Sequence, residues 1–396
     1  MTVTQAETLA EDLAAETLTH PPQLPRSPAD EKPRRVYHIG FAAPGRSKIF
    51  HYDEDGQPDD SFRVRTLYCG ISTGTELTHF TGTNPYLHAF WDDDLKIFEE
   101  GRGKTEYPLP FSGYMQAGRV EASQADAVRE GEIVAMSYGH KSGHTANANQ
   151  ELFFPLPADL DPVLGIYVAQ MGPICANGIL HADEEAYDGY VQQFGAGVQG
   201  RNVLICGTGV IGLLTGMICR WAGAAEVAVA GRNAWKLSVA ESLGLHPINT
   251  RETDVGRWAK QRWHDGAGMR GAHVAFQCTG AAEMLHHALR ALQPQAAVID
   301  LGFYQEGADQ VFLGREFHHN GLKHLCAQIG RVPRKLAAHW DRRRLAVETI
   351  RFLKAEGTLV RERLITHTFP FREAQRAFDL LASDGQRALQ VVLQCD

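Results

Sequence analysis

The hydrophobic pattern of residues 35–137 is that of short strands separated by turns. Four segments have the length and the apolar–polar alternation of half-buried strands: Val36–Phe41, Ser61–Leu67, Gln116–Ala122 and Glu132–Ser137. Strands at this spacing predict a small barrel-like β domain. The acidic and aromatic segment Phe80–Glu106 interrupts them, and we interpret it as an insertion that borders a cleft. Its aromatic residues Phe80, Tyr86, Phe90 and Trp91 are candidates to line a pocket, and the alternative is a surface loop that makes an oligomer contact.

From Pro162 onward the pattern changes to helices that alternate with buried strands. The predicted elements are strand Val203–Cys206, helix Ile211–Trp221, strand Val227–Ala230, helix Ala234–Leu243, strand His273–Gly280, helix Ala282–Leu292 and strand Ala296–Gly302. This alternation predicts an α/β fold with a right-handed, doubly wound parallel sheet. The last segment, Leu345–Leu393, has the pattern of helix, strand, helix and strand.

A G-x-G-x-x-G motif joins the first of these strands to its helix, which is the context of a dinucleotide-binding turn. Gly207 permits the tight turn, Gly209 lets the backbone approach a pyrophosphate, and Gly212 lets the helix pack close to the strand. The helix N-terminus offers free N–H groups to the phosphates. The alternative is a tight turn without a ligand. The predicted contacts are Gly207, Thr208, Gly209, Val210, Ile211 and Gly212.

The end of the second strand bears on the choice of cofactor. NAD sites carry Asp or Glu there to bind the ribose hydroxyls. This strand instead ends in Gly231, Arg232 and Asn233, and Lys236 follows one turn later. No carboxylate would repel a 2′-phosphate, and the guanidinium of Arg232 can pair with that phosphate. The sequence therefore favours NADPH over NADH, and the alternative for Arg232 is a solvated loop charge.

Two later strand ends are also predicted to lie near the cofactor. Ligands of doubly wound sheets bind outside the carboxyl ends of the strands. Two groups of residues occupy such ends: Cys278, Thr279 and Gly280, and Leu301, Gly302 and Phe303.

Composition narrows the class of protein. A chain of 396 residues is expected to form two domains. Its net charge of -8 argues against nucleic acid or an anionic membrane as a partner, and no apolar run approaches ~20 residues. Seven scattered cysteines, with no C-x-x-C pair, indicate reduced thiols and a cytoplasmic location. Residues 1–34, acidic and then proline-rich, are interpreted as a disordered or loosely docked tail rather than a targeting signal.

Together these parts resemble the medium-chain dehydrogenase/reductase superfamily over residues 35–396. The motifs that carry the resemblance are Gly70–Glu76 (GISTGTE), Pro110–Gly113 leading to Gly118, Gly131–Val134, the glycine-rich turn, Phe276–Gly280, and Thr366–Phe371 with Glu373 and Ala374. In NADP-dependent members the usual acidic position is replaced, as it is here by Gly231 and Arg232. The GISTGTE string is also similar to that of the bacteriochlorophyllide-dehydrogenase-like branch.

The resemblance implies a domain order and an assembly. A GroES-like β-barrel catalytic domain would span residues 35–165, a Rossmann NADP-binding domain 166–335, and a return to the catalytic domain 336–396. The resemblance further implies a homodimer or homotetramer in which edge strands of the Rossmann sheets pair. We expect Val298–Leu313 to be that edge.

The resemblance also indicates what this chain lacks. Zinc-dependent members carry a cysteine in a GICGTD string and a histidine in a GHE string, where this chain has Ser72 or Thr73, and Tyr114. The third ligand region, 170–177, has no clear match, and residues 81–108 contain no cysteine for a structural zinc. We therefore expect no metal. The alternative is an unusual ligand set drawn from Cys69, Glu76, His79, His140, His144 and Cys175.

Without zinc, a hydrogen-bond donor must stabilise the oxyanion that forms when NADPH reduces a carbonyl. We expect Tyr114 to be the donor or acid, assisted by Ser72 or Thr73, with His140 as a second candidate. A core role for Tyr114 is the alternative. The predicted function is an NADPH-dependent oxidoreductase of specialised metabolism that interconverts a ketone and a secondary alcohol. A zinc-independent enone or quinone reductase and a non-catalytic NADPH-binding protein remain alternatives.

Overall fold

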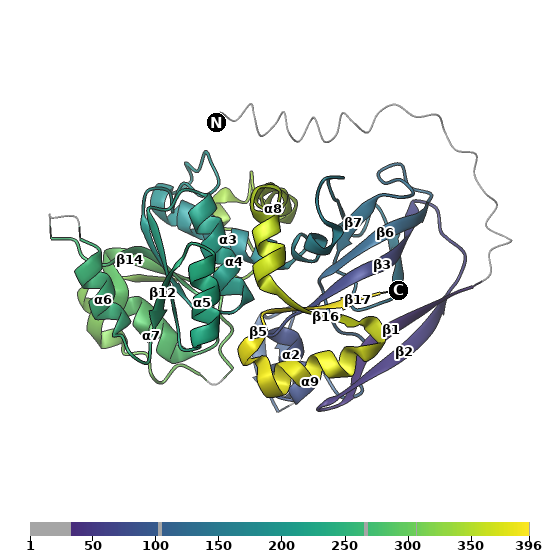
Figure 1. Ribbon diagram of the computed structural model, residues 1–396, viewed down its shortest axis with the longest axis horizontal. Helices are drawn as coiled ribbons and strands as arrows, with labels where there is room; N and C mark the ends of the chain where they lie inside the picture. The colour runs from purple at the N-terminus through teal and green to yellow at the C-terminus, as the bar shows by residue number, and fades with distance from the viewer. Residues whose placement is uncertain (1–32, 102–104, 265–267, 306, 396) are drawn as a thin grey trace.

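The computed structural model describes residues 33–101, 105–264, 268–305 and 307–395. The predicted tail, residues 1–34, lies outside these ranges except for its last two residues. Two large sheets form the two ends of the molecule, and the C-terminal segment runs back from one to the other (Figure 1). Within the described ranges, no helix has both the length and the apolar character needed to cross a bilayer.

The first large sheet is mainly antiparallel and contains both early and late parts of the chain. Its strands follow the order β16-β17-β3-β6-β7-β9, with β8 paired to β3. Their bounds are β3 Ser61–Ile71, β6 Gln116–Ser123, β7 Ile133–Met136, β8 Gly143–Asn147, β9 Phe154–Pro155, β16 Ile365–Pro370 and β17 Gln390–Gln394. A separate hairpin precedes them, formed by β1 (Arg34–Ala43) and β2 (Arg46–Glu54). The predicted early strands are confirmed, and β3 extends four residues beyond its predicted end.

The second large sheet has six parallel strands in the order β12-β11-β10-β13-β14-β15. Numbered along the chain, this is the 3-2-1-4-5-6 order of a dinucleotide-binding sheet, so the predicted doubly wound sheet is confirmed. The strand bounds are β10 Asn202–Cys206, β11 Glu226–Gly231, β12 His246–Asn249, β13 Ala272–Gln277, β14 Leu292–Asp300 and β15 Lys323–Cys326.

Helices cover both faces of the parallel sheet, because alternate side chains of each strand point to opposite cores. Val203 and Ile205 pack with the helices of one face, whereas Leu204 and Cys206 belong to the core of the other. The first face carries α3 (Met171–Tyr187), α4 (Val210–Trp221) and α5 (Ala234–Ser242), and the second carries α6 (Val255–Arg262) and α7 (Ala282–Ala291).

The prediction that Val298–Leu313 forms the edge of the parallel sheet is wrong. Strand β14 pairs with β13 on one side and with β15 on the other, so Val298 lies inside the sheet. The edge is β15, a four-residue strand of sequence KHLC. Strand β15 is not predicted from the sequence, because its polar residues form no apolar run. Strand β12 is not predicted either, because it is equally short and contains a proline.

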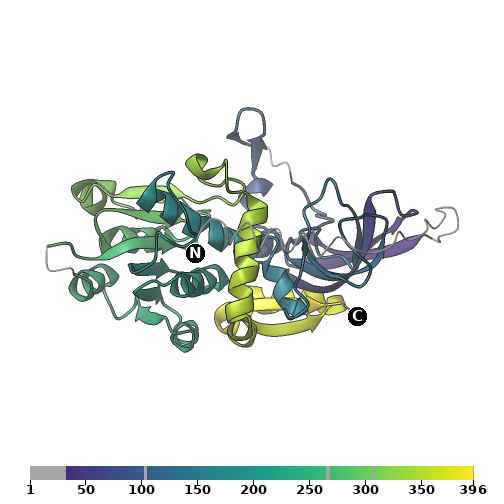
Figure 2. The same cartoon turned by 90° about the horizontal axis from the view of Figure 1, so that it is seen from above.

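The last segment returns to the first sheet in the predicted order of helix, strand, helix and strand. Helix α8 (Arg342–Leu364) stands between the two sheets (Figure 2), and α9 (Ala374–Asp384) joins β16 to β17. Strand β17 then pairs antiparallel with β3, where Val391 lies opposite Ile71. The amide Nε2 of Gln390 also donates to the carbonyl of Ile71 at 3.0 Å.

The acidic and aromatic insertion begins at the end of a short helix and continues as a single turn and a small hairpin. These are α2 (Thr75–Thr81), η2 (Pro85–Leu87), β4 (Ala89–Asp92) and β5 (Ile97–Glu100). Phe80 is only 2% exposed and stacks on Phe378 with ring centroids 5.2 Å apart. The expectation that Phe80 lines a pocket is therefore wrong, because α9 covers it and makes it part of the core.

Candidate functional site

The glycine-rich turn is built by close backbone approach. Gly207 has φ +123°, and a Cβ on Gly212 would lie 2.0 Å from the carbonyl oxygen of Gly207. Helix α4 therefore packs directly on the turn. Gly209 differs, because no other atom of the described chain lies within 4 Å of where its Cβ would be. No side chain of these residues caps α4, so its first N–H groups face open space suited to a phosphate.

At the end of β11, Thr208 takes up the space next to Gly231. A Cβ on Gly231 would lie 2.5 Å from Cγ2 of Thr208, which leaves no room for an acidic side chain. Arg232 is exposed and has no carboxylate partner among the residues the structure describes. Asn233 caps α5 by accepting from the N–H of Lys236 at 2.9 Å and donates to the carbonyl of Gln386. Burial lowers the pKa of Lys236.

The two later strand ends lie together beside this turn. Gln277 pairs with Asp300 in the sheet, so the residues that follow them meet. A Cβ on Gly302 would lie 2.0 Å from the carbonyl oxygen of Thr279, and one on Gly280 would lie 2.5 Å from that of Phe303. The structure therefore brings Cys278–Gly280 and Leu301–Phe303 into contact at the carboxyl edge of the sheet.

One of these loops is held by a carboxylate that the sequence pattern did not single out. Asp300 is buried at the end of β14 and accepts from the N–H of Gly302 at 2.8 Å. Its other oxygen accepts from Oη of Tyr304 and Nε2 of His324, both at 2.7 Å. The signal was present in the sequence, since an acid ends an otherwise apolar strand (AAVID).

Three of the four predicted catalytic residues form a buried hydrogen-bonded cluster with Glu76. Oη of Tyr114 donates to Oγ of Ser72 at 2.5 Å, and the backbone N–H of Ser72 donates to Glu76 at 2.9 Å. The second oxygen of Glu76 lies 2.6 Å from Nε2 of His140 and 3.3 Å from Oγ of Ser112. Glu76 is 2% exposed and His140 is fully buried. From the sequence, Glu76 is expected only as an alternative metal ligand, whereas the structure makes it the centre of the cluster.

Hydrogen bonding assigns the proton positions in this cluster. Nδ1 of His140 is buried without a partner in the described part of the chain, so the proton belongs on Nε2, which donates to Glu76. Burial and then the charge of Glu76 raise the pKa of Tyr114 to about 12, and hydrogen bonds with Ser72 and Thr75 offset only part of this. Tyr114 therefore keeps its proton at neutral pH and can donate through Ser72.

A cavity of about 180 Å³ connects this loop with the glycine-rich turn. Thr73, next to Ser72, lines the cavity together with Gly209, Val210 and Lys236. Thr73 follows β3 of the first sheet, whereas the other three belong to the turn and helices that flank the second sheet. One of the predicted catalytic residues, Thr73, therefore shares a cavity with predicted cofactor residues, and Ser72 is its neighbour in the chain.

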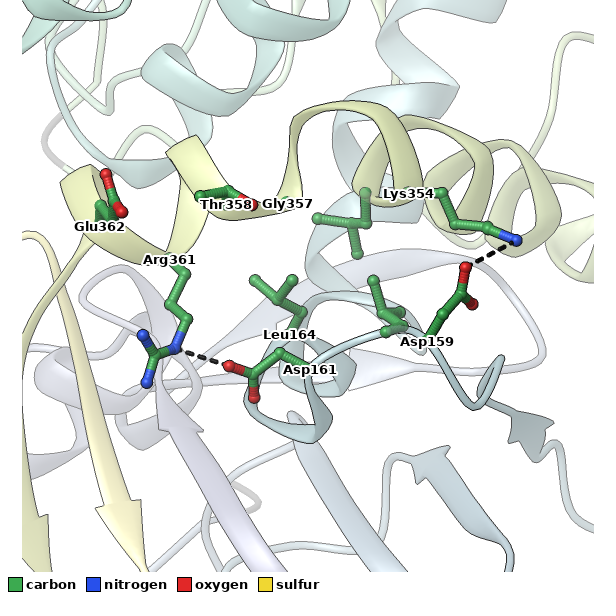
Figure 3. A pocket seen from close by; sticks show the side chains of 10 residues that line it. Asp159, Asp161, Leu164, Lys354, Gly357, Thr358, Arg361 and Glu362 are labelled. Atoms are coloured by element: carbon green, nitrogen blue, oxygen red, sulfur yellow. Dashed lines mark ion pairs between the residues drawn. The ribbon is translucent and has the colours of Figure 1, made fainter.

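A larger cavity of about 280 Å³ lies elsewhere, between α8 and the turn η3 (Pro162–Tyr167) (Figure 3). Two ion pairs flank it, Asp159 with Lys354 at 3.3 Å and Asp161 with Arg361 at 2.7 Å. It contains none of the predicted site residues, so we place the functional site at the smaller cavity.

The side chains at the cluster do not fit a zinc site. A zinc ion in a protein takes at least three ligands from cysteine, histidine and carboxylates. Across residues 33–101, 105–264, 268–305 and 307–395, no three such side chains come together. Glu76 and His140 bond each other, and His144 bonds Glu151 at 2.7 Å instead of joining them. The two hydroxyls that occupy the remaining positions are weak zinc ligands at neutral pH.

Comparison with known proteins agrees with this architecture. Residues 210–335 match the family described as zinc-binding dehydrogenase. The D-guloside 3-dehydrogenase of Escherichia coli K12 is 30% identical over 363 residues, covering 85% of this chain and 93% of that protein. Two solved structures share the fold. A putative zinc-binding dehydrogenase from Sinorhizobium meliloti bound to NADP has a TM-score of 0.67 and 20% identity, covering 91% of this chain and 99% of that one. An E. coli protein described as a short chain alcohol dehydrogenase, in complex with NADH, has a TM-score of 0.65 and 18% identity, also covering 91% of this chain and 99% of that one.

The glycine geometry predicts that two similar substitutions act differently. Gly212→Ala should lower the free energy of unfolding by about 1–3 kcal/mol, because the new methyl group would collide with the carbonyl of Gly207. Gly209→Ala should leave it within about 0.5 kcal/mol, because its methyl group meets open space. The same methyl group would narrow the space in front of α4, so the Kd for dinucleotide should rise about tenfold or more.

Chemical denaturation and dinucleotide titration of both variants check this prediction. Dinucleotide binding by Gly209→Ala that equals that of the parent protein would contradict the placement of the phosphates.

Proposed function

The chain belongs to the zinc-binding dehydrogenases of the medium-chain dehydrogenase/reductase superfamily, and we propose that it is an NADPH-dependent oxidoreductase that interconverts a ketone and a secondary alcohol without catalytic zinc. The observation that carries the proposal is the shared cavity, where Thr73 of the hydroxyl-bearing loop faces Gly209 and Lys236 of the dinucleotide turn. A sugar or polyol is the proposed substrate class, supported by the relative that is a D-guloside 3-dehydrogenase.

The residues of the turn fit a nicotinamide dinucleotide, which when bound supplies the hydride chemistry of the reaction. The uncapped N–H groups at the start of α4 would bind its pyrophosphate. Arg232, exposed and free of carboxylate partners in the described residues, would bind a 2′-phosphate together with Lys236. Thr208 supports this choice, because its methyl group excludes the acid that would bind a free ribose hydroxyl.

The hydroxyl pair supplies the proton. Oγ of Ser72 accepts from Tyr114, so its own hydrogen is available to the oxygen of the substrate. As negative charge develops on that oxygen, the proton of Ser72 transfers to it and that of Tyr114 transfers to Ser72. Glu76 fixes the backbone of Ser72 and is itself fixed by His140. Because the pKa of Tyr114 is raised to about 12, the tyrosine is protonated at neutral pH, which is the state that ketone reduction requires. A proton from water then restores Tyr114 after each reduction.

Arg232→Ala tests the cofactor assignment. Loss of the guanidinium should raise the KM for NADPH by about 10–100-fold and change the KM for NADH by less than about threefold. Steady-state kinetics with the best substrate from a panel of polyols, sugar glycosides and ketoses measures both. Arg257→Ala, at an exposed arginine of α6 on the other face of the parallel sheet, is the matched control. Equal effects on the two cofactors would rule out a 2′-phosphate contact.

Tyr114→Phe tests the proton donor. We expect kcat for ketone reduction at saturating NADPH to fall by about 100-fold or more. Tyr138→Phe is the control, because Tyr138 is a buried tyrosine of the same region whose hydroxyl bonds Thr66 at 2.7 Å rather than the cluster. A fall for Tyr114→Phe of less than about threefold, which is ~0.6 kcal/mol, would refute the role.

The pH profile of the parent enzyme gives a second readout of the same role. A group of pKa about 12 stays protonated from pH 6 to pH 10, so reduction should be flat there, whereas alcohol oxidation needs the deprotonated form and should rise with pH. The phenylalanine variant should lose that rise.

The zinc assignment can be tested without a substrate of known identity. Elemental analysis of protein purified without chelators should give well below one zinc per chain, because the cluster offers no three-ligand set in the described residues. Activity should be unchanged after chelator treatment and after zinc is added back. About one zinc per chain, lost together with activity on chelation, would overturn the mechanism.

A further inference from the structure

The small hairpin β4–β5 has little support from the rest of the chain. Its two strands form a sheet of their own, and the hairpin projects from the body of the molecule (Figure 2). Trp91 pairs with Phe98 across it, with ring centroids 4.9 Å apart, and Tyr86 of η2 packs on the same ring at 5.6 Å. A two-stranded hairpin of this length is marginally stable by itself in water.

The outer part of this hairpin is apolar and exposed. Leu95 is 65% exposed, Ile97 50% and Phe98 46%. Asp92 fixes the tip, because its carboxylate accepts from the N–H groups of Asp94 and Leu95 at 2.8 and 2.7 Å. An ordered turn that presents three neighbouring large apolar side chains to solvent is typical of a contact surface.

The hairpin is also strongly acidic. Residues 89–101, called the arm below, contain five carboxylates against one lysine, a net charge of −4. Asp94, Glu99 and Glu100 are exposed and form no ion pair within the ranges that the structure describes. A partner for the arm must therefore combine apolar surface with positive charge.

The same chain carries such a surface. Residues 331–344, called the basic segment below, contain six lysines and arginines against Asp341, a net charge of +5 in a chain whose total is -8. Arg331, Arg334 and Arg343 are exposed and have no carboxylate partner among the described residues. The basic segment leads into α8, and the start of α8 lies on the side of the molecule from which the arm projects (Figure 2).

We propose that the arm is a self-association element, which in a dimer of this chain packs on the basic segment of the second copy. The two surfaces are complementary in charge and lie on one side of the molecule, so a two-fold axis would form both contacts at once. The exposed Ala337 and Ala338 and the half-buried Val332 give the basic segment apolar surface for Leu95, Ile97 and Phe98. This contact does not involve β15, the edge of the parallel sheet, and does not depend on the proposed activity.

Charge reversal on each side tests the proposal with the full chain. Glu99→Lys with Glu100→Lys, and separately Arg331→Glu with Arg334→Glu, should each weaken self-association about tenfold or more in sedimentation-velocity experiments at low salt. Asp126→Lys with Glu130→Lys reverses two exposed carboxylates on another loop and should leave association unchanged. Association of the parent chain should also weaken between about 50 and 500 mM salt.

A mixture of the two reversed proteins provides the decisive measurement. In a heterodimer of these variants, the reversed positions 99 and 100 of one chain face the reversed positions 331 and 334 of the other with opposite local charges, and the second contact keeps its native charges. Equimolar mixing should therefore restore association. Failure of the mixture to associate would overturn the proposal, as would a parent chain that is monomeric at all concentrations or a dimer unaffected by both reversals. Circular dichroism of each variant, in which only exposed residues change, should match that of the parent.

Discussion

The antiparallel pairing of β17 with β3 is the constraint on which the functional site depends. Residues more than 300 positions apart meet there, with Val391 opposite Ile71 and Gln390 bonded to the carbonyl of Ile71. The chain must therefore leave the first sheet, build the whole parallel sheet and return. This return fixes the loop after Ile71 against the C-terminal segment, so that Thr73, Leu389 and Gly209 line one cavity. Neither sheet contains that site by itself.

The three glycines of the dinucleotide turn differ in the space around them. Two are tightly packed and support the turn, whereas one faces open space where a ligand could bind. Gly207 and Gly212 have no room for a side chain, because backbone or Thr279 occupies it. Gly209 has room, and the first N–H groups of α4 point there without a cap in the described chain. The contact between Thr208 and Gly231 is a further example, since the side chain of Thr208 occupies the space where a side chain on Gly231 would begin.

In the hydroxyl cluster, burial and one nearby charge together determine the protonation state of a tyrosine. Glu76 is buried beside Tyr114, where a carboxylate would be costly without partners, and it is stabilised by bonds from Ser72, Ser112 and His140. The resulting charge and the low exposure of the site raise the pKa of Tyr114. An acid that holds its proton this firmly suits donation to a strong base such as an alkoxide. Asp300 has a comparable positioning role at the carboxyl edge of the parallel sheet, where it accepts a hydrogen bond from the backbone of Gly302.

Local pattern determined the fold class, the long strands and helices, and the glycine-rich turn, because hydrophobic period and glycine spacing depend on neighbours in the sequence. It failed at β12 and β15, which are four residues long and polar or proline-containing, and therefore misplaced the edge of the parallel sheet. It also selected Ser72, Tyr114 and His140 separately, but could not join them through Glu76, or place Phe80 under α9. Those relations arise when strands from distant parts of the chain pair. Contacts between residues far apart in sequence have no period for a single sequence to display, so only the tertiary structure decides them.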